Sequence, residues 1–189
     1  MVTTNDARAD FPAAPRWQGV NHLAMVTPDM DTTVRFYEGV LGMRLVATTM
    51  AGPMRHYFFE IAPGNTIAFF EVKGAATFAK PAGAPPTFPM QFDHLSFDVP
   101  DEHALEQLRK RLLAAGSDVT PVVDHGFIRS VYFTDPTGIA LEASWWVVDA
   151  TGRPVDFDDS SVFGDPDPVA AVRELREGRL ERVPTTRLV

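Results

Sequence analysis

Two stretches of the chain begin with the same short pattern and continue in the same order, which limits its possible folds more than any other feature. Asn21-His22-Leu23 and Asp93-His94-Leu95 each lie in a short apolar segment, and Pro28-Asp29 and Pro100-Asp101 follow them at equal spacing. A pattern that returns in this way predicts two copies of one supersecondary unit. The sequence therefore predicts an internal duplication within one domain.

Each copy has the pattern of a strand, a helix and three further strands. Short apolar, β-branched runs indicate the strands, and apolar residues at helical spacing between an early Asp and a closing Gly indicate the helices. In the first copy we expect a helix between 29 and 42 and strands at 20–27, 43–47, 56–61 and 66–72. In the second copy we expect a helix between 101 and 116 and strands at 91–99, 119–124, 129–134 and 139–144. The prediction is an α+β domain at 17–146, made of two βαβββ modules at 17–73 and 91–146.

The segments outside the modules have different compositions. Residues 1–16 are rich in Ala, Pro and charge and lack periodicity, so we expect a flexible N-terminal arm. Residues 74–90 hold clusters of Gly and Pro, which indicate a linker or flap. The tail at 147–189 is acidic and contains Pro, and we expect it to form one short amphipathic helix with Val172 and Leu175 on its buried side.

The composition excludes several classes of protein. Lys and Arg number 17 and Asp and Glu number 25, which gives a net charge of −8, and the basic residues form no run. Nucleic acids and anionic membranes attract clustered positive charge, so neither is an expected partner. Cysteine is absent, which excludes disulfide scaffolds and thiolate metal sites. No apolar run approaches the roughly 20 residues of a membrane span, and the polar N-terminus lacks the order of a signal peptide, so we expect a cytoplasmic protein.

The chain has five histidines, and two of them occupy the same position in the two copies. These are His22 and His94, near the start of each first strand. Glu142 lies among apolar residues in the last predicted strand, where a carboxylate is costly to bury unless something positive neutralises it. Two imidazoles and one carboxylate cover one face of a metal ion and leave other positions open for substrate and oxygen. We therefore predict a metal site formed by His22, His94 and Glu142.

The segment from Asn21 to Gly42 resembles the opening of the vicinal oxygen chelate superfamily, which contains glyoxalases, bleomycin-binding proteins, fosfomycin-resistance transferases and type I extradiol dioxygenases. The resemblance extends over about residues 19–146. It implies two βαβββ modules whose cupped sheets enclose one metal ion, with ligands from the first and last strands of the modules. The three predicted ligands fall at those places. Because one scaffold of this kind carries several chemistries, the fold alone leaves the reaction open.

A narrower motif resembles the signature of the extradiol ring-cleaving dioxygenases. Its elements are His125, an aliphatic residue followed by Tyr132, the Asp-Pro-Thr-Gly turn at 135–138, and the closing Glu142. The resemblance implies that Glu142 binds iron, and that Tyr132 and His125 line the pocket and form hydrogen bonds with the bound substrate. The turn places Tyr132 and Glu142 on adjacent antiparallel strands, where directly opposed residues come within about 5 Å.

These residues together predict a one-domain enzyme similar to the extradiol dioxygenases. We expect Fe(II), or else Mn(II), on the three ligands, with a small aromatic diol and O₂ as substrates. Tyr132 and His125 are the expected catalytic residues, because their hydrogen bonds would stabilise charge that develops on substrate oxygens. The resemblance, and the frequency of closed two-fold assemblies among soluble proteins, also predict a homodimer.

Two departures from the dioxygenase pattern keep other functions open. That family usually has a further acid–base histidine shortly before the second ligand histidine, whereas residues 73–93 contain none, so His56 or His103 would have to replace it. Glu71 lies in the last strand of the first module, where glyoxalases have a fourth ligand, and is either a ligand or a carboxylate facing solvent. With Glu71 as ligand and base, the chain would be a glyoxalase-like isomerase or a thiol-conjugating lyase that uses Zn(II), Ni(II) or Co(II). A third alternative is a metal-free protein that binds a drug-like aromatic molecule.

Overall fold

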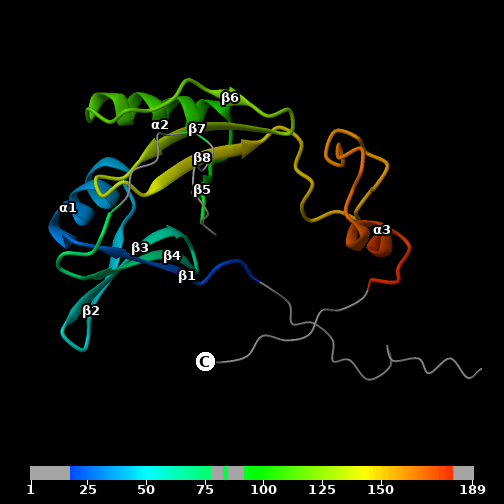
Figure 1. Cartoon of the computed structure of the whole chain (residues 1–189). Coiled ribbons are helices and arrows are strands. Elements are labelled where there is room, and N and C mark those ends of the chain that lie inside the picture. Colours follow the sequence, from blue (N-terminus) through cyan, green and yellow to red (C-terminus); the bar gives the residue numbers. More distant parts are fainter. Residues whose placement is uncertain (1–17, 78–82, 85–91, 181–189) are drawn as a thin grey trace, which may run out of the picture. The chain divides into compact units, whose positions relative to one another are not determined.

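The computed structural model describes residues 18–77, 83–84 and 92–180 (Figure 1). The chain divides into two compact units, Met1–Thr77 and Phe78–Val189, and each predicted module lies in its own unit. The predicted N-terminal arm at 1–16 and much of the predicted flap at 74–90 lie outside the described residues.

The first unit is a βαβββ module, as the sequence predicts. Its sheet has the strand order β1-β4-β3-β2, in which β1 runs parallel to β4 and the other neighbours are antiparallel. In chain order the elements are β1 (His22–Thr27), α1 (Met30–Val34), the π-helical segment η1 (Arg35–Val40), β2 (Leu45–Ala51), β3 (Met54–Ala62) and β4 (Asn65–Glu71).

The second unit repeats this plan. Its sheet has the strand order β5-β8-β7-β6, again with the first and last strands parallel and adjacent. The elements are β5 (Leu95–Asp98), α2 (Glu102–Ala114), β6 (Val123–Asp124), β7 (Ile128–Thr134) and β8 (Ala140–Trp146), followed in the tail by α3 (Ala170–Arg176). The predicted α+β class and the duplication of the βαβββ unit are therefore confirmed.

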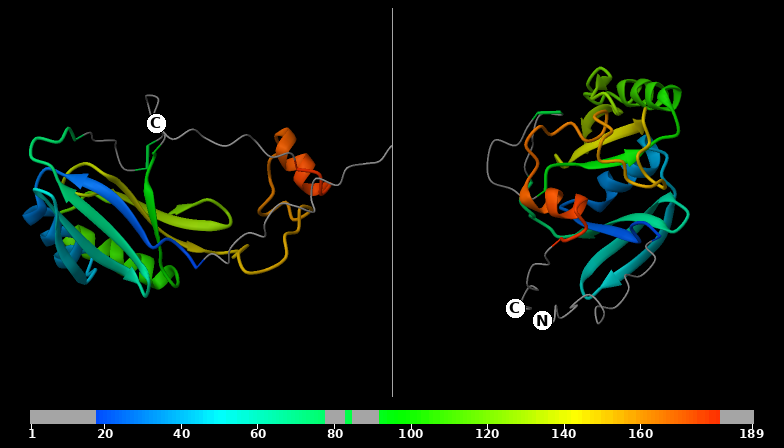
Figure 2. Two further views of the ribbon diagram at one scale, coloured as in Figure 1. Left: turned by 90° about the horizontal axis from the view of Figure 1, so that it is seen from below. Right: turned by 90° about the vertical axis from the view of Figure 1, so that its right-hand side faces the viewer.

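A helix covers one face of the sheet in the second unit, as Figures 1 and 2 show for α2. Leu105 of α2 is fully buried, and so are Val131 and Phe133 of β7. Because side chains alternate between the two faces along a strand, Ser130 and Tyr132 point to the opposite face of β7. We call this opposite face, which α2 does not cover, the open face of the second sheet.

The first unit has an equivalent core between its helical segment and its sheet. Tyr37 is fully buried there, and its ring lies 5.5 Å from that of Phe59 and 4.8 Å from that of Phe69. Phe59 and Phe69 lie on adjacent strands and are fully buried as well. The opposite side of this sheet is the open face of the first sheet.

The same local signals begin and end the helical segments of both modules. The side chain of Asp29 accepts a hydrogen bond from the backbone N–H of Thr32 at 3.2 Å, and that of Asp101 accepts one from Ala104 at 2.7 Å. Both Pro-Asp pairs therefore mark a capped helix start, as predicted. Where the helical segments end, Gly42 and Gly116 have φ angles of 76° and 79°, in the left-handed region that glycine adopts at such ends.

Two strands are shorter than predicted. The strand predicted at 119–124 is reduced to Val123–Asp124, because Pro121 has no N–H to donate to a neighbouring strand. The strand predicted at 91–99 begins only at Leu95, so His94 immediately precedes β5, and residue 91 lies outside the described part of the chain.

The helices also differ in part from the prediction. The first helix continues as the π-helical segment η1, in which the N–H of Leu41 bonds to the carbonyl of Phe36 at 2.9 Å. In α3 the predicted burial is wrong for Leu175, which is 50% exposed, whereas Val172 is half-buried. No helix within the described residues is long and apolar enough to cross a membrane.

Candidate metal centre

Glu142 lies in the middle of β8, with a strand on each side. It is paired with Ser96 of β5 and directly opposite Tyr132 of β7, and it is only 6% exposed. Side chains at directly paired positions point to the same face of a sheet. The Glu142 carboxylate therefore lies on the open face of the second sheet, together with the Tyr132 ring.

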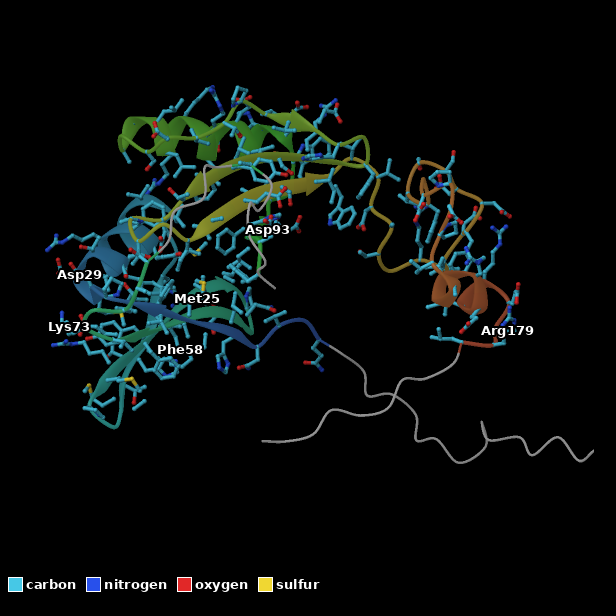
Figure 3. The ribbon with its side chains drawn as sticks, in the orientation of Figure 1. Met25, Asp29, Phe58, Lys73, Asp93 and Arg179 are labelled. Carbon is cyan, nitrogen blue, oxygen red and sulfur yellow. The ribbon has the colours of Figure 1, made fainter. Side chains whose placement is uncertain are left out.

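His94 contacts this carboxylate. Its Nε2 lies 2.8 Å from Oε2 of Glu142, and its Nδ1 lies 2.5 Å from Oδ2 of Asp93, which is labelled in Figure 3. An ionised carboxylate has no proton to donate, so Nδ1–H donates to Asp93 and a neutral imidazole carries its lone pair on Nε2. A lone pair that faces a second carboxylate at this distance requires a proton or a metal ion between them.

The spacing of these two atoms fits a metal ion. Two ligands that bind one metal ion at about 2.1 Å and at right angles lie about 3 Å from each other. The 2.8 Å between Nε2 of His94 and Oε2 of Glu142 is close to this value. One imidazole nitrogen and one carboxylate oxygen are also donors that first-row divalent ions accept.

The surroundings of Glu142 favour its charged form. Burial raises the pKa of the carboxyl group, but the hydroxyls of Ser130, Ser96 and Tyr132, together with the neighbouring His94 ring, outweigh burial, so its pKa lies below the usual value. The nearby Ser130 hydroxyl lowers the pKa of Glu142, although the fully buried Oγ of Ser130 makes no hydrogen bond of normal geometry. The carboxylate is therefore held in the ionised form that a metal ligand requires.

Tyr132 and His125 form a hydrogen-bonded pair next to this carboxylate. Nε2 of His125 lies 2.9 Å from the Tyr132 hydroxyl, and the Tyr132 ring meets the His94 ring edge-on, with 5.8 Å between centroids. Burial raises the pKa of the Tyr132 hydroxyl, and the charge of Glu142 raises it further, so the phenol is neutral near pH 7. The structure thus brings together His94, Glu142, Tyr132 and His125, whose roles stay predictions.

A cavity of about 180 Å³ opens beside His94 and Tyr132 and is also lined by Gly83, Ala84, Asp93, Ala140 and Leu141. Gly83 packs against the Tyr132 ring: a Cβ atom at this position would lie 3.2 Å from Cδ2 of Tyr132, and its φ angle is +71°. A larger residue there would both displace the ring and strain the backbone. Sequence reasoning missed Gly83 because its segment has no periodicity.

His22, the third predicted ligand, lies in the first unit at the beginning of β1. Its Nδ1 is 2.7 Å from Oδ1 of Asn21, and its ring meets that of Phe58 edge-on at 5.7 Å. Phe58 is labelled in Figure 3. Among residues 18–77, 83–84 and 92–180, no three His, Asp or Glu side chains form by themselves a group that could hold a metal ion. That His22 joins His94 and Glu142 on one ion therefore stays a prediction.

The strand pairing shows which residues correspond in the two modules. In the second unit Glu142 pairs with Ser96, two positions after His94. In the first unit Ala68 pairs with Ala24, two positions after His22. Ala68 therefore holds the place of Glu142, and the next strand gives Phe58 the place of Tyr132. At these two positions the open face of the first sheet is apolar, whereas that of the second sheet is polar.

Glu71 does not lie at the position of a fourth ligand. Its Oε1 accepts hydrogen bonds from the backbone N–H of Met30 and from Nζ of Lys73, each at 3.0 Å, and its Oε2 accepts one from Arg55. Its side chain is only 8% exposed. The structure therefore supports neither alternative from the sequence, because Glu71 neither faces solvent nor has a free oxygen for a metal ion.

This arrangement predicts an acid-dependent loss of stability. The N–H of Met30 and the cations of Lys73 and Arg55 lower the pKa of Glu71 from 4.5 to about 2. Because the folded pKa is the lower one, the stability that Glu71 contributes is complete above the unfolded value and is lost as the pH falls through the folded value. Urea unfolding between pH 6 and about 2 should therefore show a steeper decline for the wild type than for Glu71→Gln. Equal slopes would contradict this role of Glu71.

Neither His103 nor His56, the two candidates for the missing acid–base histidine, forms a hydrogen bond with Tyr132 among those of the described residues. His103, in the first turn of α2, is exposed, and its Nε2 lies 2.7 Å from Nε2 of Gln107. His56, in the first unit, stacks on Phe70 with 3.7 Å between ring centroids, and its buried Nε2 has no hydrogen-bond partner. Within the described residues of the second unit, His125 is the histidine that forms a hydrogen bond with Tyr132.

Comparisons with known sequences agree with this fold. The sequence pattern of the Glyoxalase/Bleomycin resistance protein/Dioxygenase superfamily matches residues 19–143. Metallothiol transferase FosB of Shouchella clausii is 29% identical over 133 residues, which cover 66% of this chain and 77% of that protein. A Bacillus subtilis protein named "Putative ring-cleaving dioxygenase MhqA" is 27% identical over 137 residues, which cover 64% of this chain but only 41% of that protein.

Solved structures show the same architecture. The crystal structure of a glyoxylase/bleomycin resistance protein/dioxygenase domain from Frankia sp. EAN1pec matches with a TM-score of 0.58 and 26% identity, over 69% of this chain and 99% of that one. The superfamily match extends through both modules and includes all the predicted site residues, which are His22, His94, His125, Tyr132 and Glu142.

Proposed function

Because the chain belongs to the glyoxalase/bleomycin resistance protein/dioxygenase superfamily, we propose that it is a metal-dependent dioxygenase that opens the ring of a small aromatic diol beside its two hydroxyls. The observation that carries the proposal is the set of contacts on the open face of the second sheet. The pair of His94 and Glu142, at 2.8 Å, adjoins the hydrogen-bonded pair of Tyr132 and His125, at 2.9 Å. The similarity to the Bacillus subtilis protein supports the same class of reaction.

We propose His94 and Glu142 as two metal ligands, with His22 as the third. When bound, Fe(II) or Mn(II) supplies Lewis acidity toward the diol and a route for electrons between the diol and O₂. The ionised state of Glu142 and the free lone pair on Nε2 of His94 suit this ion. Ala68 holds the place of a second carboxylate, which favours a three-ligand set over the four-ligand set of a glyoxalase-like isomerase.

Tyr132 and His125 hold and move a proton in the proposed reaction. A diol hydroxyl must lose its proton before its oxygen can carry negative charge. The Tyr132 oxygen accepts that proton while its own hydroxyl proton passes to Nε2 of His125, along the 2.9 Å hydrogen bond. Both atoms of O₂ enter the ring-opened product, so the reaction needs no separate reductant.

The size of the cavity suits a small substrate. Its volume of about 180 Å³ is below the range of roughly 300–1,000 Å³ that is typical of drug-sized ligands. Ala140 and Leu141 supply apolar surface, and Gly83 leaves room beside the Tyr132 ring. We therefore propose a diol with a single ring.

Thiol transfer is a second candidate with support of its own. The metallothiol transferase FosB of Shouchella clausii is 29% identical to this chain, and a three-ligand metal site also suits activation of an electrophile. The two reactions consume different co-substrates, which are O₂ in ring cleavage and a thiol in transfer. Consumption of these co-substrates therefore separates the two candidates.

The deciding experiment uses protein purified without oxygen and loaded with Fe(II) or Mn(II). Oxygen uptake is followed on a panel of substituted catechols, together with the yellow absorbance of the ring-opened product. The same samples are tested for loss of a small thiol in the presence of a small electrophile. One O₂ consumed per product formed supports ring cleavage. Thiol consumption without oxygen uptake supports transfer instead, and binding of aromatic molecules without either reaction supports a binding protein.

We also propose that the chain acts as a homodimer. Closed two-fold pairs are the commonest assembly of soluble proteins, and β2, at the end of its four-stranded sheet, exposes Val46 and Met50 by 42% and 59%. Light scattering at micromolar concentration should give twice the chain mass of 20.8 kDa. A mass near that of one chain would contradict the dimer.

A further inference from the structure

In each module, the residue directly before the predicted ligand histidine places a side-chain oxygen next to Nδ1 of that histidine. Oδ1 of Asn21 lies 2.7 Å from Nδ1 of His22, and Oδ2 of Asp93 lies 2.5 Å from Nδ1 of His94. We propose that Asn21 and Asp93 are positioning residues that fix both histidines for metal binding through Nε2, and that the charged Asp93 makes His94 the stronger ligand. The inference rests on the proposed metal site, but not on the proposed reaction.

The hydrogen bonds determine which ring nitrogen is available. An amide oxygen and a carboxylate oxygen are acceptors, so Nδ1 of each imidazole must carry the proton. The lone pair of the neutral ring then lies on Nε2. In His94 this nitrogen lies 2.8 Å from Oε2 of Glu142, a separation that two ligands of one metal ion can have. Asp93 therefore selects the tautomer and also restrains rotation of the ring.

The two partners differ in charge, and this difference makes the two histidines unequal. A carboxylate that accepts from Nδ1–H pulls the proton away from the ring and makes Nε2 more basic than an amide oxygen does. Asp93 is such a carboxylate, whereas Asn21 offers only a dipole. The side chains of His94 and Asp93 are 31% and 41% exposed, so water competes for the Nδ1 proton and the effect on affinity is moderate.

The repeated arrangement argues against two chance surface contacts. Asn21 and Asp93 occupy the same place in the two modules. Asn21 directly precedes His22, which begins β1, and Asp93 directly precedes His94, which comes just before β5. They differ in charge but share an oxygen at the same branch of the side chain. Both copies therefore provide an oxygen that accepts a hydrogen bond from Nδ1–H of the histidine. The copies differ in how strongly this oxygen attracts the proton.

Metal affinity tests the proposal directly. Co(II) binding is measured by competition with a chromophoric chelator for the wild type, Asp93→Ala, Asp93→Asn and Asn21→Asp. Asp93→Ala should bind about 10–100-fold more weakly, which is the usual cost of losing such a partner. Asp93→Asn keeps an acceptor and should lose less, whereas Asn21→Asp should bind more tightly. The exchanged double variant, Asn21→Asp with Asp93→Asn, should recover most of the lost affinity.

Proton NMR of the Co(II)-loaded protein gives a second readout, which a purely structural role would not change. Each histidine that binds through Nε2 shows one strongly shifted, exchangeable Nδ1–H signal. The signal of His94 should disappear through fast exchange with water in Asp93→Ala but remain in Asp93→Asn. Circular dichroism of the same samples checks that the variants are folded.

The outcomes separate this inference from the proposed reaction. Wild-type affinity and an unchanged Nδ1–H signal in Asp93→Ala would overturn the positioning role, whatever the enzyme does. Protein that binds Co(II) with the expected order of variants but, loaded with Fe(II), consumes no O₂ would overturn only the dioxygenase reaction. Wild-type protein that binds no Co(II) would overturn the metal site and this inference together.

Discussion

Replacing Glu142 by Gln should lower metal occupancy by several orders of magnitude and leave the fold in place. An amide has almost the shape of the carboxylate but lacks the charge that neutralises a divalent ion, so the loss should exceed the roughly 10–100-fold cost of removing an outer hydrogen-bond partner. His94→Ala should have a comparable effect, because its Nε2 lies 2.8 Å from the same carboxylate. Metal analysis after equilibrium dialysis measures both.

Two further variants make this test specific. Glu71→Gln removes a buried carboxylate of the first unit whose oxygens bond to Met30, Lys73 and Arg55, so it should keep full metal content. His22→Ala should lose the metal as His94→Ala does, which tests the prediction that one ion has ligands from both modules. Stoichiometric metal in Glu142→Gln would reject the site assignment, and stoichiometric metal in His22→Ala would reject the third ligand.

The second large effect concerns turnover. Tyr132→Phe and His125→Ala should each retain the metal but lose roughly 10²–10³ in turnover, as the removal of one preorganised hydrogen-bonding group does in other enzymes. Both variants break the 2.9 Å bond through which the proton of the substrate is proposed to leave. The Michaelis constant for the diol should change much less, because the metal ligands are intact.

Tyr57→Phe is the matched control for this pair. Tyr57 lies on β3 of the first unit and pairs with the core residue Phe69. Tyr57→Phe therefore removes a hydroxyl from the helix-covered face of the first sheet. Oxygen uptake by Tyr57→Phe should equal that of the wild type. If both Tyr132→Phe and His125→Ala also kept wild-type uptake, the reaction would stand and the roles of Tyr132 and His125 would not.

The parts of the fold that sequence reasoning predicted are those that depend on local chemistry. The Pro-Asp pairs, Gly42 and Gly116 act within a few residues of themselves, so helix starts and ends follow from the sequence. The π-helical segment does not, because the order of apolar and polar residues in its six positions also satisfies an α-helical pattern. The exposure of Leu175 was unpredictable for another reason, since amphipathic spacing says nothing about whether a partner surface is present.

In the candidate site, too, the local contacts could be predicted from the sequence and the long-range contacts could not. Tyr132 and Glu142 are joined by a short turn, so their pairing followed from the sequence. Glu71 was misplaced because the register of a parallel pair cannot be read from two distant segments. That register puts Ala68, three residues earlier, opposite the position equivalent to Ser96. Gly83 was missed because its contact with Tyr132 joins an irregular segment to a strand, and no spacing rule connects them.

The correspondence between the modules also shows on which face the two halves differ in chemistry. On the helix-covered faces, two equivalent pairs are apolar and buried in both copies: Phe59 with Phe133, and Ile67 with Leu141. On the open faces equivalent residues differ in kind, as Phe58 against Tyr132 and Ala68 against Glu142. Packing against a helix constrains one side of each sheet, whereas the other side is free to change. A duplicated domain of this design can therefore acquire a new reaction by substitutions on a single face of a single half, at little cost to either core.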